Sequence, residues 1–288
     1  MNRRAHRVWV VLVLGCGRVI DSGPAKPAAA LPELNAVPAP TSTACADEPG
    51  MAYIPGGVLA RYNTVIRPAS PVPVDPLWID RYETTVEEYA ACVEAGACTV
   101  PHRSTSGWSG HTSQMVPLVC TWELEGEAGL PINCMDGDQH DAYCRFRGKR
   151  TPFAHELLWV MTNRDANSAY PWGDAPPPTC DLAIVDEDTD DDEAGCGRNR
   201  PWPVGSRPTD VTRDGVYDMA GNIGEKSLSP FRPDHPVGEL RKGVGGAWSV
   251  HLSPRGSWSS SDKTGYSDNS GFRCAKDPSR LPPCTVAP

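Results

Sequence analysis

The chain has 288 residues, of which 39% are hydrophobic and 22% are charged, and its formal net charge is −9. This length allows one large domain or two modest ones. The 30 proline and 27 glycine residues form no repeat and indicate a turn-rich globular domain with a disordered segment attached. No basic stripe is present, so we expect no nucleic-acid partner.

The start of the chain predicts an export signal. A basic start, Met1–Arg7, precedes the apolar run Val8–Leu14, which is too short to span a bilayer because a spanning helix needs about 20 residues. The ending Val-Leu-Gly-Cys16 resembles a bacterial lipobox. We therefore expect residues 1–16 to be a signal peptide with Cys16 lipidated, and a lipid anchor in the bacterial cell envelope, at the outer membrane. An ordinary cleaved signal peptide is the alternative.

The cysteine count fits an exported chain. If Cys16 is lipidated, ten of the 11 cysteines remain, and an even number in an exported chain implies a disulfide framework. The expected local pairs are Cys92/Cys98, Cys134/Cys144 and Cys180/Cys196. The partners of four cysteines stay open: Cys45, Cys120, Cys274 and Cys284.

Composition divides the rest of the chain. Residues 17–49 are rich in Pro and Ala without periodicity, and predict an extended tether. We expect one folded domain at 50–278 and a C-terminal tail at 279–288.

The first predicted elements of the domain are short. A strand and turn are expected at Met51–Gly57, and a second strand at Leu77–Asp80. Thr85 and Glu88 have the spacing of a capping box, so a helix is expected to start there and to run to Glu94. His102 and His111 lie in a Ser/Gly-rich stretch that we interpret as loop, with both side chains exposed to solvent; a role as metal ligands is the alternative.

Two more helices are expected further along. Asp138–Arg147 predicts a helix with Ala142, Tyr143 and Phe146 on its buried face. Thr151 and Pro152 suit an N-cap and a first helical position, and that helix is expected to run to Asn163. From Trp202 onward, short strands alternate with turns.

A turn-rich stretch, Arg213–Glu225, carries a carboxylate at each end of its second half, Asp218 and Glu225. Oxygen ligands on a flexible turn suit Ca²⁺. A tight turn with two solvated acids is the alternative, because acids beside a Gly-Asn turn are common.

An ordered set of motifs resembles the formylglycine-generating enzyme family, also called sulfatase-modifying factor. The motifs with the clearest resemblance are Tyr217–Asn222, Gly245–Trp248 and Gly271–Arg273, preceded by Ile79–Thr85, Gly148–Arg150, Pro152, Glu156, Tyr170–Asp174 and Pro203–Ser206. The resemblance implies an α+β, C-type-lectin-like fold with little regular secondary structure, here with disulfides added.

The resemblance also implies that this chain lacks the family's two copper-binding cysteines. In the active oxidases, two cysteines that follow the Gly-Gly-Ser-Trp step bind Cu(I), because thiolate is the soft ligand that selects it. In this chain those positions are Val250 and Arg255, and neither side chain binds copper. We therefore do not expect copper or the oxidase activity.

A structural calcium site is implied by the same resemblance. Its ligands map to Asp218, Gly221, Ile223 and Glu225. A further family calcium site has an Asn where this chain has Ala183, so that site is in doubt. The acidic run 186–193 lacks the pattern of an EF-hand loop and is interpreted as a solvated loop, with a weak calcium site as the alternative.

We expect the family's groove to bind a peptide, a glycan or an envelope protein. Trp and Arg most often anchor interfaces. The expected rim is Trp248, His251, Arg255, Trp258 and Arg273. Two alternatives remain open: a formylglycine-generating or other protein-modifying oxidase with a rebuilt metal site, and a structural lipoprotein within an envelope assembly.

Overall fold

The computed structural model describes residues 48–64, 67–103, 107–108, 115–116, 118–187, 193–229, 239–250 and 257–278. The predictions for residues 1–47 and 279–288 lie outside this part of the chain, as does His111. The signal peptide, Cys16, the tether, Cys45 and Cys284 are therefore not described.

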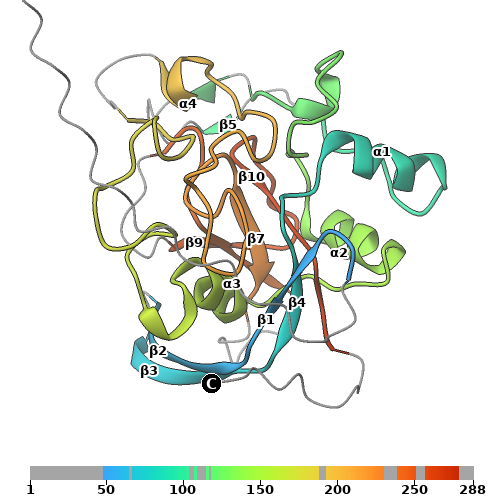
Figure 1. Ribbon diagram of the computed structural model, residues 1–288. Helices are drawn as coiled ribbons and strands as arrows, with labels where there is room; N and C mark the ends of the chain where they lie inside the picture. The colour runs from blue at the N-terminus through green and yellow to red at the C-terminus, as the bar shows by residue number, and fades with distance from the viewer. Residues whose placement is uncertain are drawn as a thin grey trace, which may run out of the picture. The chain divides into compact units, whose positions relative to one another are not determined.

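Short strands and short helices are joined by long connections (Figure 1). The strands are β1 (Met51–Ile54), β2 (Gly57–Thr64), β3 (Arg67–Val74), β4 (Leu77–Asp80), β5 (Gly107–Trp108), β6 (Met115–Val116), β7 (Gly224–Leu228), β8 (Leu240–Val244), β9 (Ser257–Asp262), β10 (Ser270–Gly271) and β11 (Ala275–Lys276). The helices are α1 (Val86–Glu94), α2 (Gly137–Phe146), α3 (Ala154–Met161) and α4 (Ala194–Gly197), with two 3₁₀ turns, Thr121–Glu123 and Arg164–Ala166.

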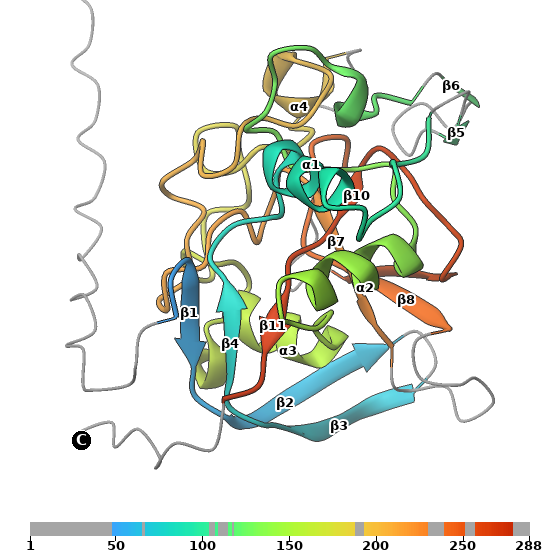
Figure 2. The same ribbon diagram turned by 90° about the vertical axis from the view of Figure 1, so that its right-hand side faces the viewer.

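Two sheets bring distant segments together. In the first sheet, β4 lies between β1 and β11 and is antiparallel to both, so the start and end of the domain meet there (Figure 2). The second sheet has the order β10-β7-β8-β9, with β10 parallel to β7 and the other pairs antiparallel. This mixture of small sheets and helices confirms the predicted α+β class with little regular structure.

Helix α1 begins where the capping box predicted. The Thr85 hydroxyl accepts from the Glu88 amide at 3.2 Å, and the Glu88 carboxylate accepts from the Thr85 amide at 3.0 Å. Asp136 and Gln139 form the same reciprocal pair at the start of α2, at 3.0 and 3.1 Å. Each pair satisfies two amides that the first helical turn leaves free.

The other helix predictions need correction. Helix α3 begins at Ala154, because the Glu156 carboxylate accepts from the Phe153 amide at 2.7 Å; Pro152 is not its first residue. The Thr151 hydroxyl donates to Asp141 at 2.5 Å instead of capping the helix. On α2, Tyr143 is buried as expected, but Phe146 lies in the last turn and is 42% exposed.

The largest core cluster lies between α3, the first sheet and the turn before β7. Its members include Ile54, Ile79, Leu157, Val216 and Met219. A second cluster joins α1 and α2 to the segment after β10, through Tyr89, Tyr143 and Phe272. These clusters fix the position of the loops that precede β7.

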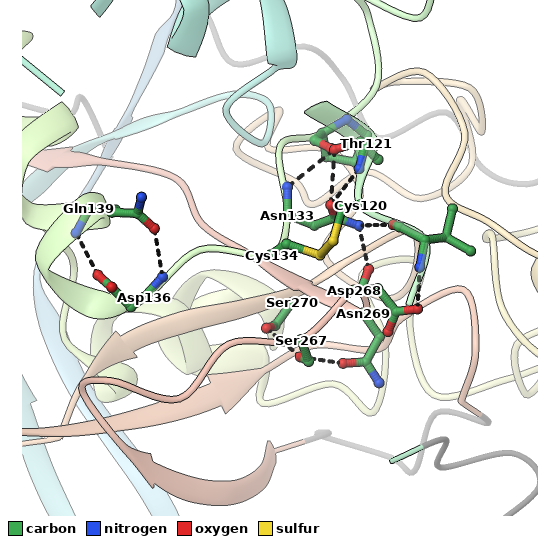
Figure 3. Close-up of a disulfide and its surroundings, with 12 residues drawn as sticks. Cys120, Thr121, Asn133, Cys134, Asp136, Gln139, Ser267, Asp268, Asn269 and Ser270 are labelled. Atoms are coloured by element: carbon green, nitrogen blue, oxygen red, sulfur yellow. Dashed lines mark hydrogen bonds between the residues drawn. A yellow bond between two sulfur atoms is a disulfide. The ribbon is translucent and has the colours of Figure 1, made fainter. Parts of the chain in front are cut away.

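The disulfides differ from one sequence prediction. Cys92–Cys98 and Cys180–Cys196 are bonded as expected. Cys134, however, is bonded to Cys120 (Figure 3), and Cys144 is bonded to Cys274. The prediction of a Cys134/Cys144 pair was wrong because most of helix α2 lies between them. Seven helical residues rise about 10 Å, and a disulfide allows Cα atoms at most about 7 Å apart.

Candidate functional site

The connection that leads into β7 uses two left-handed residues. Asp218 has φ 59° and Asn222 has φ 62°, a conformation that short polar side chains tolerate better than most. Asn222 then bridges two distant segments. Its side-chain oxygen accepts from the Trp202 amide at 2.8 Å, and its Nδ2 donates to Glu83 at 2.6 Å.

Two buried carboxylates bind backbone amides of this connection, and a third, within the connection, binds an amide of another segment. Asp210 accepts from the amides of Ala220 and Gly221, each at 3.0 Å. Glu83 accepts from the Ile223 amide at 3.0 Å, and Asp218 from the Gly205 amide at 2.6 Å. The N–H groups of this turn therefore point toward protein carboxylates.

A single buried arginine offsets the negative charge of these acids. Arg273 is fully buried, and its Nε donates to Glu225 Oε1 at 2.7 Å. Its remaining nitrogens donate to the carbonyls of Asp80, Arg81 and Tyr217, at 3.0, 3.0 and 2.7 Å. Arg273 thus ties the first sheet to the turn and to β7.

The electrostatics of this cluster are unusual. Burial is the main cause that raises the pKa of Glu83 and of Asp210 well above the usual range, and the charge of Asp218 adds to both. Burial also raises the pKa of Asp218, to about 6, against hydrogen bonding by Gly205 and the charge of Arg273. Several acids share one cation, so the cluster retains protons at a pH where ordinary carboxylates have lost them.

The residues that the resemblance implied as calcium ligands are engaged by other protein groups, although Glu225 Oε2 is buried without a hydrogen-bond partner among the described residues. Glu225 Oε1 is bound to Arg273, and Asp218 Oδ2 accepts from the Gly205 amide. The amides of Gly221 and Ile223 point at Asp210 and Glu83. Among the described residues, no three His, Cys, Asp or Glu side chains gather in a way that could hold a metal ion. Arg273 supplies a positive charge beside this turn, and calcium at these residues stays a prediction.

Val250, at the family's first copper position, is an aliphatic residue in a tight turn. Val250 is half-buried, and its amide donates to the Ala247 carbonyl at 3.1 Å. All eight cysteines in the described ranges are in disulfides, so no thiolate is left there for Cu(I). Arg255, the second position, lies outside those ranges.

The structure does not place the predicted groove residues together. Arg273 is inside the protein, so its assignment to a groove rim was wrong. Trp248 is 7% exposed, and its Nε1 donates to the Asp268 carbonyl at 3.2 Å. That carbonyl also accepts from Asn133 beside the Cys120–Cys134 disulfide (Figure 3). Trp248 therefore packs inside, contrary to expectation, while His251, Arg255 and the side chain of Trp258 are not described.

Sequence reasoning missed a tryptophan that is accessible near Trp248. Trp202 is half-buried and packs against the cluster of Ile184, Ala194 and Trp248. The guanidinium carbons of Arg198 and Arg207 lie 4.4 and 4.6 Å from its ring centroid. This group, Arg198, Trp202 and Arg207, is called the Trp202 platform below. The spacing of one Trp between two Arg was its only sequence signal.

His102 also has a specific partner. Its Nε2 lies 2.7 Å from Asp136 Oδ2, and its ring stacks on Tyr266 at 4.4 Å. It is partly buried in these contacts instead of being a free loop histidine.

Among the described helices, none combines the length and apolar character needed to cross a membrane.

Comparison with known proteins identifies relatives of this chain. The Sulfatase-modifying factor enzyme 1-like domain family matches residues 37–278. The Mus musculus protein Inactive C-alpha-formylglycine-generating enzyme 2 is 23% identical over 82% of this chain and 88% of its own length. Hercynine oxygenase of Mycolicibacterium thermoresistibile is 27% identical over 58% of this chain, a match that spans 39% of that enzyme.

Solved structures confirm the fold. PvdO from Pseudomonas aeruginosa superimposes with a TM-score of 0.60 at 20% identity, over 81% of this chain and 96% of PvdO. CarF superimposes with a TM-score of 0.56 at 14% identity, over 79% of this chain and 97% of CarF. At these identities the likeness concerns the fold alone.

Proposed function

Because this chain belongs to the Sulfatase-modifying factor enzyme 1-like family, we propose that it is a member without copper oxidase activity that binds a peptide, glycan or protein partner. The observation that carries this proposal is the state of its thiols. The copper position that the structure describes is Val250, and the eight described cysteines are all in disulfides. A Cu(I) site needs soft ligands, which Val250 and Arg255 at the two family copper positions do not supply.

The relatives are consistent with this proposal. The mouse relative that shares most of its length with this chain is named as inactive. Hercynine oxygenase shares only 39% of its own length with this chain, so its activity gives little support for an oxidase here.

The Trp202 platform is the part of the proposed binding surface that lies within the described residues. Arg198 is exposed, and Trp202 offers a half-buried indole held by a hydrogen bond from its Nε1 to the Gly195 carbonyl at 2.9 Å. A fixed aromatic ring flanked by guanidinium groups suits a partner that carries carboxylates, whether on a peptide or on a sugar. His251, Arg255 and Trp258 remain the proposed continuation of this surface.

We further propose that the domain is exported and lipid-anchored through Cys16 at the outer membrane of a bacterial cell envelope. Four disulfides support an oxidising compartment, since such bonds are rare in the cytosol. The mass of the mature N-terminus tests the anchor: a diacylglyceryl-modified Cys16 is expected, and an unmodified N-terminus elsewhere would contradict it.

One experiment separates the binding and oxidase functions. The protein is loaded with Cu(I), and oxygen uptake is measured with a cysteine-containing peptide and a thiol reductant. In parallel, peptide and glycan collections are screened with the wild-type protein and with Arg198→Ala and Trp258→Ala. We expect no oxygen uptake above background and a ligand whose binding is lost in these variants.

The control variant is Phe146→Ala, because Phe146 is an exposed aromatic residue at the end of α2. It is expected to leave binding unchanged. Tight binding of one equivalent of Cu(I) together with peptide-dependent oxygen uptake would overturn the proposal. Co-purification with envelope proteins and no ligand in either collection would favour a structural role.

A further inference from the structure

The face that the second sheet turns toward α2 carries a buried arginine. Arg241 on β8 pairs with Leu228 on β7 and with Ser261 on β9, so these side chains share one face of the sheet. Arg241 is 1% exposed. Its Nη2 donates to the Gly137 carbonyl at 3.0 Å and to Asp141 Oδ2 at 2.7 Å.

These bonds leave some hydrogen-bond donors of the Arg241 guanidinium without acceptors. Within the described part of the chain, Nε and Nη1 of Arg241 are buried and have no hydrogen-bond partner. Helix α2 makes room for this guanidinium with a glycine, because a Cβ on Gly137 would lie 2.3 Å from Nε. The unsatisfied side of Arg241 therefore lies within the protein.

A buried histidine stands on the same helix face. Gly137, His140 and Asp141 are spaced i, i+3 and i+4, so His140 lies beside the two residues that Arg241 contacts. His140 is fully buried and stacks on Phe272 at 4.4 Å. Neither of its ring nitrogens has a hydrogen-bond partner in the described ranges.

The surroundings of His140 are cationic. Burial lowers the pKa of His140 well below its usual range, and the charges of Arg241 and Lys226 lower it further. Lys226 lies on the same face of the sheet, with Nζ 3.0 Å from Ser261 Oγ. The only carboxylate that Arg241 binds among the described residues is that of Asp141.

Donors in this position need an acceptor. An unpaired buried N–H costs about 1–3 kcal/mol, and more when the group is charged. Asp141 binds Arg241 only at Nη2, so Nε and Nη1 still lack acceptors, and the nearby charge of Lys226 favours an anion over water at this position. Because Arg241 and His140 are at least 99% buried, the acceptor must be small.

We propose that a small inorganic anion of the halide class binds inside the fold, between β8 and α2, through Nε and Nη1 of Arg241 and the ring of His140. The anion would complete the packing of the second sheet on α2. It links β8, which leads into the Gly245–Trp248 segment, to the helix that carries the Cys144–Cys274 disulfide.

Bromide identifies such a site because its anomalous scattering separates it from water. Crystals of the full chain grown in sodium bromide are expected to show an anomalous peak in contact with Arg241 Nε and Nη1 and with His140. In solution, the thermal unfolding midpoint is measured against chloride or bromide, with sodium gluconate at equal ionic strength as reference. We expect the halides to raise the midpoint in a saturable way.

Two variants and a control assign the effect. His140→Phe keeps the ring that stacks on Phe272 but removes the nitrogens, and is expected to abolish the halide response; Arg241→Met is the second variant. If Arg241→Met does not fold, the halide response of His140→Phe alone decides whether the site exists. Lys276→Met removes a surface cation, which pairs with Glu48 at 2.6 Å, and should keep the response.

Three results would overturn the proposal. The first is a water without anomalous signal at this position. The second is a halide response that His140→Phe retains. The third is a bromide peak that appears only at molar concentration, with no effect on the unfolding midpoint, which would show an adventitious ion only.

Discussion

Arg273 binds Glu225 inside the protein, with Nε 2.7 Å from Oε1 and neither side chain more than 2% exposed. One partner lies after β10 and the other on β7, and three carbonyls complete the hydrogen bonds of the arginine. The turn before β7 is therefore held by protein groups: carboxylates bind its amides, and Arg273 supplies the positive charge.

Replacing Arg273 should strongly destabilise the fold. Arg273→Met leaves Glu225 buried without its cation, and breaking a buried pair costs about 3–5 kcal/mol. Urea unfolding of the variant measures this loss. The control, Lys276→Met, breaks an ion pair whose side chains are about one third exposed, and should cost about 0–1 kcal/mol. Equal effects of the two variants would contradict the role of Arg273.

Asp218 makes stability depend on pH. Its pKa is about 6 in the folded protein and about 4 in an unfolded chain, so the folded state binds the proton more tightly. Its stabilising contribution is complete below pH 4 and is lost as the pH rises to about 6. Two pKa units correspond to about 3 kcal/mol.

The variant Asp218→Asn tests this dependence, because the new amide keeps an acceptor for the Gly205 amide and tolerates φ 59°. The variant should gain stability relative to the wild type as the pH rises from about 4 to about 7. The control, Asp165→Asn, removes an exposed carboxylate whose pKa is lowered by a hydrogen bond from Arg213, so its stability relative to the wild type should change mainly below about pH 4 and stay nearly constant from about pH 4 to about 7. A stability difference between the wild type and Asp218→Asn that stays constant across this pH range would refute the shifted pKa.

The Cys144–Cys274 disulfide should contribute more than Cys92–Cys98. It closes a loop with a sequence separation of 130, against 6 for the other. Loop-closure entropy predicts about 5 kcal/mol for the long loop and about 2 kcal/mol for the short one. Unfolding of the two double Cys→Ala variants measures the difference, and a larger loss from the Cys92–Cys98 pair would go against this estimate.

Gly221 should not tolerate a side chain. A Cβ at this position would lie 2.5 Å from the Ile184 carbonyl oxygen, and backbone there cannot yield cheaply. Gly221→Ala should cost about 1–3 kcal/mol by overpacking. Gly129→Ala is the matched control, since its Cβ would meet only Pro203, at 3.8 Å. Thermal unfolding of both variants checks this, and a neutral Gly221→Ala would show that the turn can shift.

The sequence predicted the elements that local rules determine. The capping box of Thr85 and Glu88 gave the correct start of α1, and Leu77–Asp80 is a strand as expected. The motif resemblance gave the fold. These features depend on spacing along the chain, which a sequence displays directly.

The interior of the site could not be predicted in this way. Arg273 was assigned to the groove rim because Trp and Arg most often anchor interfaces, and only the fold reveals the carbonyls that satisfy it. Glu83 binds the Ile223 amide, which lies 140 residues further along the chain, and no local pattern distinguishes it from a surface acid. Cys144 likewise finds its partner across the fold, at Cys274.

Our central claim is that this chain has no free thiolates for a copper site, and the oxidation state of its cysteines tests that claim most directly. The chain with Cys16, Cys45 and Cys284 replaced by Ser is unfolded without reductant, alkylated, digested and analysed by mass spectrometry. We predict no alkylated cysteine and four linked peptide pairs: Cys92–Cys98, Cys120–Cys134, Cys144–Cys274 and Cys180–Cys196. Two free thiols that bind Cu(I) in the folded protein would contradict the account and restore an oxidase.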